Sequence, residues 1–333
     1  MNATMNVPIN APLTVPAAPP AGAVAFGQKL QRALQALVYK MAPPQFTLMN
    51  LVADRWRADA LGALVRLGVA DGLGTEARSA DDLARELQLN ADALYRVLRA
   101  LARDGLLNET GDRRFSLNGI TAPLRRTHPH SMANMVLELS SVRNPECWSR
   151  LPEALKTGRE VWSSHHDRDM WSWLDARPEE HAIFHGAMTE LTREGAGPFA
   201  RGFPFGDFDS VVDLGGGTGR LLANVLAAHP RSRGVLIDHA SVVAQSSPVF
   251  ERYAVTDRVE VISGNLFADA PPPGKGVYLL KHILHGADDV TASSLPPGAA
   301  RRCAMTRGSS PSTSSCPRPP LLSSRSSTSR CSW

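Results

Sequence analysis

Three glycines at alternate positions, Gly215, Gly217 and Gly219, follow directly after residues 211–214, which are apolar except for Asp213. A run of β-branched and aliphatic residues is typical of a buried strand in a parallel sheet. Glycine takes positive φ freely and lacks Cβ, so a ligand can lie directly against its main chain. The segment therefore predicts a strand, a tight turn that binds a ligand, and a helix over 220–228.

The spacing of these glycines argues against a dinucleotide. Dinucleotide sites favour Gly-x-Gly-x-x-Gly with a pyrophosphate at the helix N-terminus, and the third glycine of that pattern would fall on Arg220. Asp213 precedes the turn, and a second acid, Asp238, ends the next predicted strand, 234–238. This pattern resembles motif I of the S-adenosylmethionine-dependent methyltransferases. That cofactor carries an ammonium, a sulfonium and a ribose diol but no phosphate, so nearby carboxylates attract it.

The first candidate site therefore consists of Asp213, the three glycines and Asp238, whose carboxylate is placed to accept from ribose hydroxyls. The alternative is an ordinary glycine turn followed by an unrelated loop acid. Two further strands are expected at 259–263 and 276–281. Strands that alternate with helical segments predict a parallel sheet. We expect an α/β Rossmann-like methyltransferase domain over 201–290.

Residues 79–117 predict a winged helix. Ser79 and Asn90 are expected to cap two helices, and Gly105 to end the second. A hairpin turn follows at 109–113. The second helix has apolar residues at i, i+3, i+4 and i+7, which are Leu94, Val97, Leu98 and Leu101. The expected unit is a mainly α winged-helix dimerisation domain over 26–125.

A winged helix also occurs in DNA-binding regulators, and Arg96, Arg99 and Arg103 recur along its second helix. Asp92 and Asp104 balance these arginines, and the first turn of the helix offers no Asn, Gln, Ser or Thr to reach bases. The alternative function is therefore a non-catalytic dimerising or DNA-binding winged-helix protein with a relic cofactor domain. Nucleic acid is not the expected partner.

The N-terminal segment 1–25 is rich in Pro, Ala and Asn and has no charged side chain, which predicts a disordered arm rather than a signal peptide. An amphipathic helix is expected over 26–41, and its apolar stripe needs a partner. A second subunit is one candidate, so we expect a homodimer.

A helical connector is expected over 126–200, and it carries much of the aromatic content of the chain. Trp148, Phe184 and Met188 are candidates for lining a substrate pocket, because pockets tend to form where domains join. The alternative is that these side chains fill the core.

The 333 residues carry a formal net charge of +4 and four cysteines. No apolar run approaches the length of a membrane span, and the cysteines show neither a disulfide framework nor metal-ligand spacing. We therefore expect a cytoplasmic protein with no membrane partner and no metal site.

From 47 to 289 the chain resembles the dimeric small-molecule O-methyltransferases, which include plant caffeate-type enzymes, acetylserotonin O-methyltransferase and bacterial secondary-metabolite enzymes. The resemblance rests on the winged helix, the glycine motif and three further motifs in the same order. These motifs are Phe-x-x-Ala-Met at 184–188, Gly-Asn-Leu-Phe at 264–267 and Leu-Leu-Lys-His-Ile-Leu-His at 279–285.

The resemblance implies S-adenosylmethionine as cofactor and a hydroxyl of a small aromatic or secondary-metabolite molecule as acceptor. It implies that Gly215 and Asp238 hold the methionine and ribose parts, that Asn265 and Leu266 meet the adenine, and that Lys281 lines the site. Asn265 stands where the family usually has Asp, although an amide still matches adenine's donor and acceptor edge.

His285 matches the general base of the family. A phenol with a pKa of about 10 is mostly protonated at neutral pH, and a histidine with a pKa near 6.5 can take its proton as the methyl transfers. The position directly after the fourth strand favours a catalytic role, because ligands bind at the carboxyl ends of parallel strands.

After Val290 the chain departs from the family. The segment 291–333 is rich in Ser, Pro and Arg and contains no acidic residue. We expect a low-complexity tail that is frameshifted or disordered, which leaves the sheet C-terminally incomplete and the fourth strand as an exposed edge. Weak cofactor binding and little turnover would follow, since the lost burial would exceed the usual stability margin of about 5–15 kcal/mol.

Overall fold

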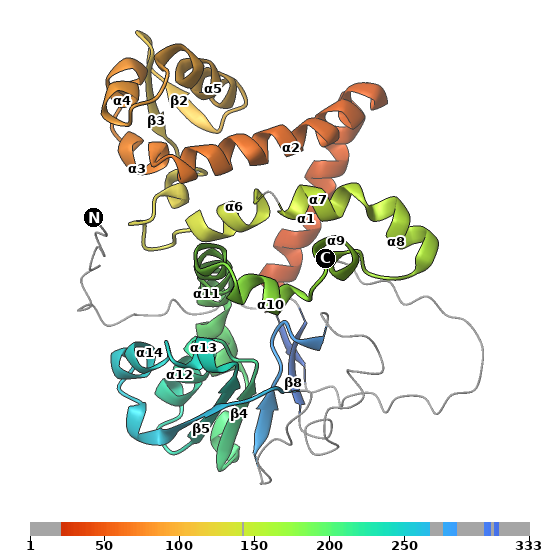
Figure 1. Ribbon diagram of the computed structural model, residues 1–333, viewed down its shortest axis with the longest axis vertical. Coiled ribbons are helices and arrows are strands. Elements are labelled where there is room, and N and C mark those ends of the chain that lie inside the picture. Colours follow the sequence, from red (N-terminus) through yellow and green to blue (C-terminus); the bar gives the residue numbers. More distant parts are fainter. Residues whose placement is uncertain (1–20, 142, 267–275, 285–302, 308–309, 313–333) are drawn as a thin grey trace. The chain divides into compact units, whose positions relative to one another are not determined.

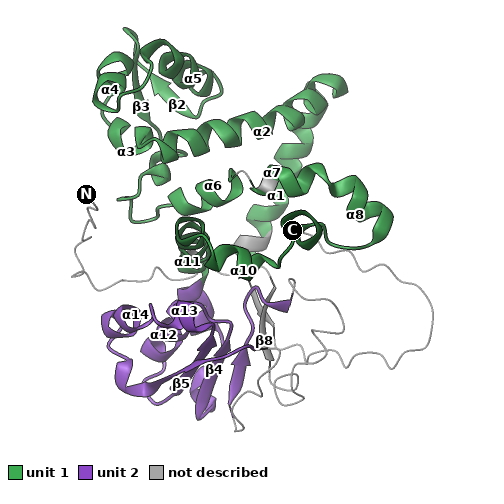
Figure 2. Ribbon diagram, viewed as in Figure 1, with its two compact units in different colours: residues 1–14, 19–195 green, residues 15–18, 196–333 purple. Residues whose placement is uncertain are grey.

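The computed structural model describes residues 21–141, 143–266, 276–284, 303–307 and 310–312. The chain divides into two compact units, the first including 19–195 and the second 196–333 (Figure 2). Each unit has its own cluster of buried apolar side chains. The described residues contain no helix long and apolar enough to cross a membrane.

The first unit begins with two long helices and continues into a small three-stranded sheet (Figure 1). The sheet is antiparallel with the order β1-β3-β2. The elements up to this sheet are α1 (Ala21–Met41), α2 (Pro44–Arg66), α3 (Val69–Leu73), β1 (Arg78–Ser79), α4 (Ala80–Glu86), α5 (Ala91–Arg103), β2 (Leu107–Glu109) and β3 (Arg114–Leu117).

The two predicted caps and the hairpin are confirmed. Ser79 Oγ accepts from the Asp82 amide at 3.3 Å, and Asn90 Oδ1 accepts from the Ala93 amide at 2.9 Å. Gly105, at φ +75°, follows the end of α5. Leu94, Leu98 and Leu101 form the buried stripe of α5, whereas Val97 lies at its flank and is exposed.

The start of α1 corrects the predicted end of the disordered arm, which was expected to span residues 1–25. The helix begins at Ala21, within the segment predicted to be disordered. Residues 21–25 contain three alanines and no proline, and alanine has the highest intrinsic helix propensity. Residues 1–20 lie outside the described part of the chain.

The rest of the first unit is helical, as predicted for the connector. Its elements are a 3₁₀ turn (Ala122–Leu124), α6 (Ala133–Leu139), α7 (Arg143–Ser149), α8 (Leu151–Thr157), α9 (Trp162–His166), α10 (Met170–Asp175) and α11 (Pro178–Gly202), which continues into the second unit.

The second unit is built on a sheet with the order β6-β5-β4-β7-β8-β9. All neighbouring strands are parallel except β8 and β9. The strand β4 lies between β5 and β7, so the chain switches direction at β4, and the carboxyl ends of strands at such a point form a ligand-binding crevice. The elements are β4 (Ser210–Leu214), α12 (Arg220–Ala228), β5 (Arg233–Asp238), α13 (Ala240–Val243), α14 (Ser247–Arg252), β6 (Val259–Ser263), β7 (Val277–Leu279), β8 (Cys303–Arg307) and β9 (Ser310–Ser312), with 3₁₀ turns at Phe205–Asp207 and Thr256–Arg258.

The two faces of this sheet bury alternate residues. Val211 of β4 packs in the cluster that contains Leu222 of α12, whereas Val212 and Leu214 lie in a second cluster with Tyr278. This alternation follows from the period of two in a strand. It assigns Asp213 to the same face as Val211, beneath α12.

The expectation that β7 is an exposed edge is wrong. Strand β8 pairs with β7 in parallel, with Tyr278 opposite Cys303 and Leu279 opposite Ala304, and β9 then pairs with β8. Strand pairing uses main-chain groups, and residues 303–305 form a short apolar run without proline or glycine. The Ser- and Pro-rich composition around this run concealed it.

Candidate cofactor site

The glycine turn joins the carboxyl end of β4 to α12. Gly215, Gly217 and Gly219 all have positive φ, at +68°, +62° and +80°. A Cβ on Gly215 would lie 2.3 Å from Ile283 Cδ1, and one on Gly219 would lie 2.3 Å from Phe250 Cζ. A Cβ on Gly217 would meet no atom of the described residues within 4 Å. Gly217 therefore presents its main chain to open space, while the other two glycines permit close packing.

Asp238 ties the end of β5 to this turn. Its Oδ2 accepts from the Gly217 amide at 2.7 Å, and its Oδ1 accepts from the His239 amide at 2.7 Å. Each carboxylate oxygen has a second lone pair. Asp238 can therefore hold the turn and still accept from a ligand's hydroxyl groups.

Asp213 is buried beneath the turn, with 1% of its surface exposed. Burial, with a smaller contribution from the Asp238 charge, raises the pKa of Asp213 to about 7. Burial also lowers the pKa of Lys281, and the Asp213 charge opposes that shift. Asp213 Oδ2 lies only 2.6 Å from the position of a Cβ on Gly216. These contacts show that Asp213 packs against the turn from below. Its contact with a cofactor stays a prediction.

The loop after β6 reaches the same place. The Gly264 amide donates to the Asp238 carbonyl at 3.0 Å, and Leu266 Cδ2 would lie 3.3 Å from a Cβ on Gly215. The structure thus brings together the predicted residues Gly215, Asp238 and Leu266, with Asn265 in the same loop. Ile283 was not predicted as a site residue. Its proximity to Lys281 within the 279–285 motif is the signal that could have identified it.

The predicted pocket residues belong to the first unit. Phe184 and Met188 lie on α11, where Phe184 meets Trp171 edge-on with 5.6 Å between ring centroids. Trp148 lies on α7 and is 55% exposed. Their role in binding an acceptor stays a prediction. His285 lies outside the described residues.

The donor set of the turn fits S-adenosylmethionine. The Asp238 carboxylate and the main-chain groups suit an ammonium and a ribose diol, whereas the described residues of the turn supply no cluster of cations for a pyrophosphate. The open space at Gly217 leaves room for a ligand against the main chain.

Comparison with known proteins identifies the family. Residues 49–122 match the O-methyltransferase dimerisation domain, and residues 148–304 match the O-methyltransferase domain. The chain is 33% identical over 253 residues to O-demethylpuromycin-O-methyltransferase from Streptomyces alboniger, covering 75% of this chain and 67% of that relative. The chain belongs to the S-adenosylmethionine-dependent O-methyltransferase family. The sequence analysis predicted that the resemblance ends near Val290. The match to the O-methyltransferase domain instead extends to residue 304.

Solved structures of the O-methyltransferase family share the fold. The mitomycin 7-O-methyltransferase MmcR has a TM-score of 0.70 and 28% identity, with 81% of this chain and 77% of that chain covered. An O-methyltransferase from neocarzinostatin biosynthesis, in complex with S-adenosylmethionine and 2-hydroxy-5-methyl naphthoic acid, has a TM-score of 0.63 and 27% identity, with 74% and 75% covered. The comparisons give no support to the non-catalytic, DNA-binding alternative.

Proposed function

We propose that this protein transfers a methyl group to a hydroxyl of a small aromatic or secondary-metabolite acceptor. The observation that carries the proposal is the hydrogen bond from the Gly217 amide to Asp238. This bond joins the carboxyl ends of β4 and β5 beside the exposed main chain of Gly217. This arrangement supports a site for a cationic cofactor with a ribose diol, as the family requires.

The proposed roles of the cofactor-site residues follow from their places. Asp238 accepts from ribose hydroxyls, and the main chain at Gly215 and Gly217 lies against the methionine part. Leu266 supplies an apolar surface for adenine, beside Asn265 with its amide. When bound, S-adenosylmethionine supplies an electrophilic methyl group on its sulfonium.

His285 is the proposed general base. It follows β7 by six residues along the chain and comes directly after Ile283 and Leu284, which pack against the sheet cluster of Val212 and Tyr278. A neutral imidazole there would accept the acceptor's hydroxyl proton as the oxygen attacks the methyl, and general-base catalysis contributes about 10²–10⁴-fold.

The proposed assembly is a homodimer formed through α1 and α2. These helices expose a series of large apolar side chains, an arrangement that marks an interaction surface. They include Phe26, Leu30, Leu34, Leu37, Val38, Phe46, Met49, Val52 and Trp56. The cytoplasmic location stays a prediction.

The test compares wild-type protein with His285→Gln. Wild-type protein is expected to bind S-adenosylmethionine in titration calorimetry and to methylate at least one member of a panel of naphthols and catechols. The variant should bind the cofactor equally well but turn over about 100-fold more slowly or worse, because only the proton acceptor is lost.

Equal turnover of the two proteins would contradict the role of His285. Failure of wild-type protein to bind the cofactor would contradict the proposed function, and it would restore the expectation that the tail after Val290 inactivates the chain. The hypothesis of a reading-frame shift is tested separately, by sequencing the nucleotides around codon 286.

A further inference from the structure

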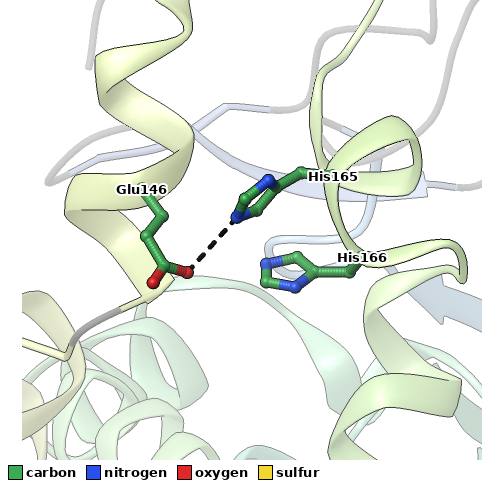
Figure 3. A group of neighbouring side chains, drawn as sticks. All are labelled: Glu146, His165 and His166. Atoms are coloured by element: carbon green, nitrogen blue, oxygen red, sulfur yellow. Dashed lines mark hydrogen bonds and ion pairs between the residues drawn. The ribbon is translucent and has the colours of Figure 1, made fainter.

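Three side chains in the first unit direct possible metal ligands toward one point. Glu146 lies on α7, and His165 and His166 are adjacent at the end of α9 (Figure 3). One ligand atom from each residue lies within 4.8 Å of the other two. His165 Nε2 and Glu146 Oε2 are 3.4 Å apart.

His165 and Glu146 are in ion-pair contact, but their separation is long for a hydrogen bond and also fits two ligands of one metal ion. Hydrogen bonds of the N–H···O type are usually about 2.7–3.2 Å long. Zinc binds histidine nitrogen and carboxylate oxygen at about 2.0–2.2 Å in tetrahedral geometry, so two of its ligand atoms are about 3.3–3.6 Å apart. The measured 3.4 Å between His165 and Glu146 is within that range.

His166 has an imidazole nitrogen that is available for coordination. Its Nε2 is buried and makes no hydrogen bond with the described residues. Because an unpaired buried polar atom is costly, a ligand bound at this nitrogen would offset that cost.

The surrounding residues fix the ends of α9 and the ring of His166, whereas His165 is exposed. Glu160 Oε2 accepts from the Ser163 amide at the start of α9, at 3.1 Å, and Asp167 ends this helix with φ +53°. The His166 ring packs against Trp162, with 4.3 Å between centroids, and against Trp173 at 5.6 Å. A ligand held in this way loses little freedom on binding.

We propose that Glu146, His165 and His166 bind a divalent transition-metal ion of the zinc type, with water in the fourth position. Two imidazoles and one carboxylate with an open position are a donor set that zinc uses in proteins. The ion would join α7 to α9 and close the chain between them, including α8. This proposal is independent of the proposed function and replaces the expectation that the chain has no metal site.

The sequence concealed this site for a physical reason. That expectation rested on the cysteines, which take no part in the cluster. The two histidines are consecutive in the chain, and the third ligand lies nineteen residues before His165. Only the packing of two helices brings the three side chains together.

The test uses full-length, untagged, chelator-treated protein and zinc alone. We expect one Zn²⁺ per chain in titration calorimetry, a higher melting temperature with zinc, and a Co²⁺ visible absorption spectrum of tetrahedral type. His165→Ala and His166→Ala should each weaken binding by about 100-fold or more, since loss of a mere outer-shell partner already costs about 10–100-fold. Glu146→Gln should weaken binding as well, because it removes the ligand charge and keeps the side-chain shape.

The matched control is His130→Ala, which removes an exposed histidine elsewhere in the first unit and should leave zinc binding unchanged. Circular dichroism of each variant checks that it is folded. Failure of the wild-type protein to bind zinc would overturn the proposal. Zinc affinity that is the same in wild-type protein and in a folded His165→Ala/His166→Ala double variant would overturn it as well.

Discussion

Asp213 is a buried acidic residue near the end of β4, and its surroundings determine the pKa of its carboxyl group. The side chain has 1% of its surface exposed, and burial raises its pKa to about 7. Asp213 lies on the α12 face of the sheet, directly beneath the glycine turn. Protonation of its carboxyl group should therefore affect the stability of this turn. A functional site often contains a group with such a shifted pKa.

This shift predicts a pH-dependent stability. An unfolded chain releases the Asp213 proton near pH 4, whereas the folded chain keeps it until about pH 7. The contribution of Asp213 to the free energy of unfolding should therefore be highest at low pH within this window and fall by about 1.4 kcal/mol per pH unit as pH rises toward 7. Urea unfolding at pH 5, 6 and 7, followed by circular dichroism, measures the slope.

Asp213→Asn has no proton to lose and keeps nearly the same shape. The variant should lose less stability than wild type between pH 5 and 7, by about 2 kcal/mol. Parallel pH profiles for the two proteins would show that Asp213 does not titrate in the folded state.

At the scale of elements, the glycine turn needs glycine for two reasons, the positive φ of its backbone and the close packing of a neighbouring helix. Gly219 begins α12 and packs against Phe250 of α14, whereas Gly217 faces open space. Both have positive φ, so both residues need the conformational freedom of glycine. Only Gly219 also needs the missing Cβ for packing.

The two glycines form a matched pair for substitution. Gly219→Ala should lower the free energy of unfolding by about 1–3 kcal/mol more than Gly217→Ala, because its methyl group would overlap the Phe250 ring. Gly217→Ala should lower the free energy of unfolding by about 1–2 kcal/mol, the cost of placing alanine in the left-handed conformation. It should also weaken cofactor binding. Chemical unfolding and calorimetry separate these effects, and an equal loss of stability in both variants would contradict the close packing of Gly219 against Phe250.

At the scale of the whole molecule, α1 and α2 present an apolar surface that the other described residues leave uncovered. Leu34 and Leu37 of α1 are each 54% exposed. Burying one such side chain contributes about 1.5–3 kcal/mol, so a surface of this kind favours association with a second copy. The family match to a dimerisation domain supports the same conclusion.

The dimer is tested by placing a charge on this surface. Leu34→Asp should shift wild-type dimers toward monomers, with the dissociation constant raised about 100-fold or more, since it removes apolar burial and adds a charge that must be desolvated. Gln35→Asp changes the same net charge at the neighbouring position and should have a smaller effect. Analytical ultracentrifugation over a range of concentrations measures both, and a monomeric wild-type protein would contradict the prediction.

Local features of the chain were predictable from sequence. The helix α12, the caps Ser79 and Asn90 and the strand β6 occur where periodicity and capping residues indicated. These signals are local, because a cap or an apolar period acts over a few neighbouring residues. For the same reason the glycine spacing and Asp238 were sufficient to indicate the cofactor class.

The tertiary structure decided the features that depend on distant segments. The pairing of β8 with β7 joins residues that are 25 apart, and the burial of Asp213 depends on the helix packed over it. The cluster of Glu146, His165 and His166 requires two helices to meet. The sequence by itself determined the cofactor class and those helices and strands that carry a strong local signal. Only the fold decided which strand covers β7, which acid is buried and which side chains form the candidate metal cluster, because these depend on contacts that no local pattern encodes.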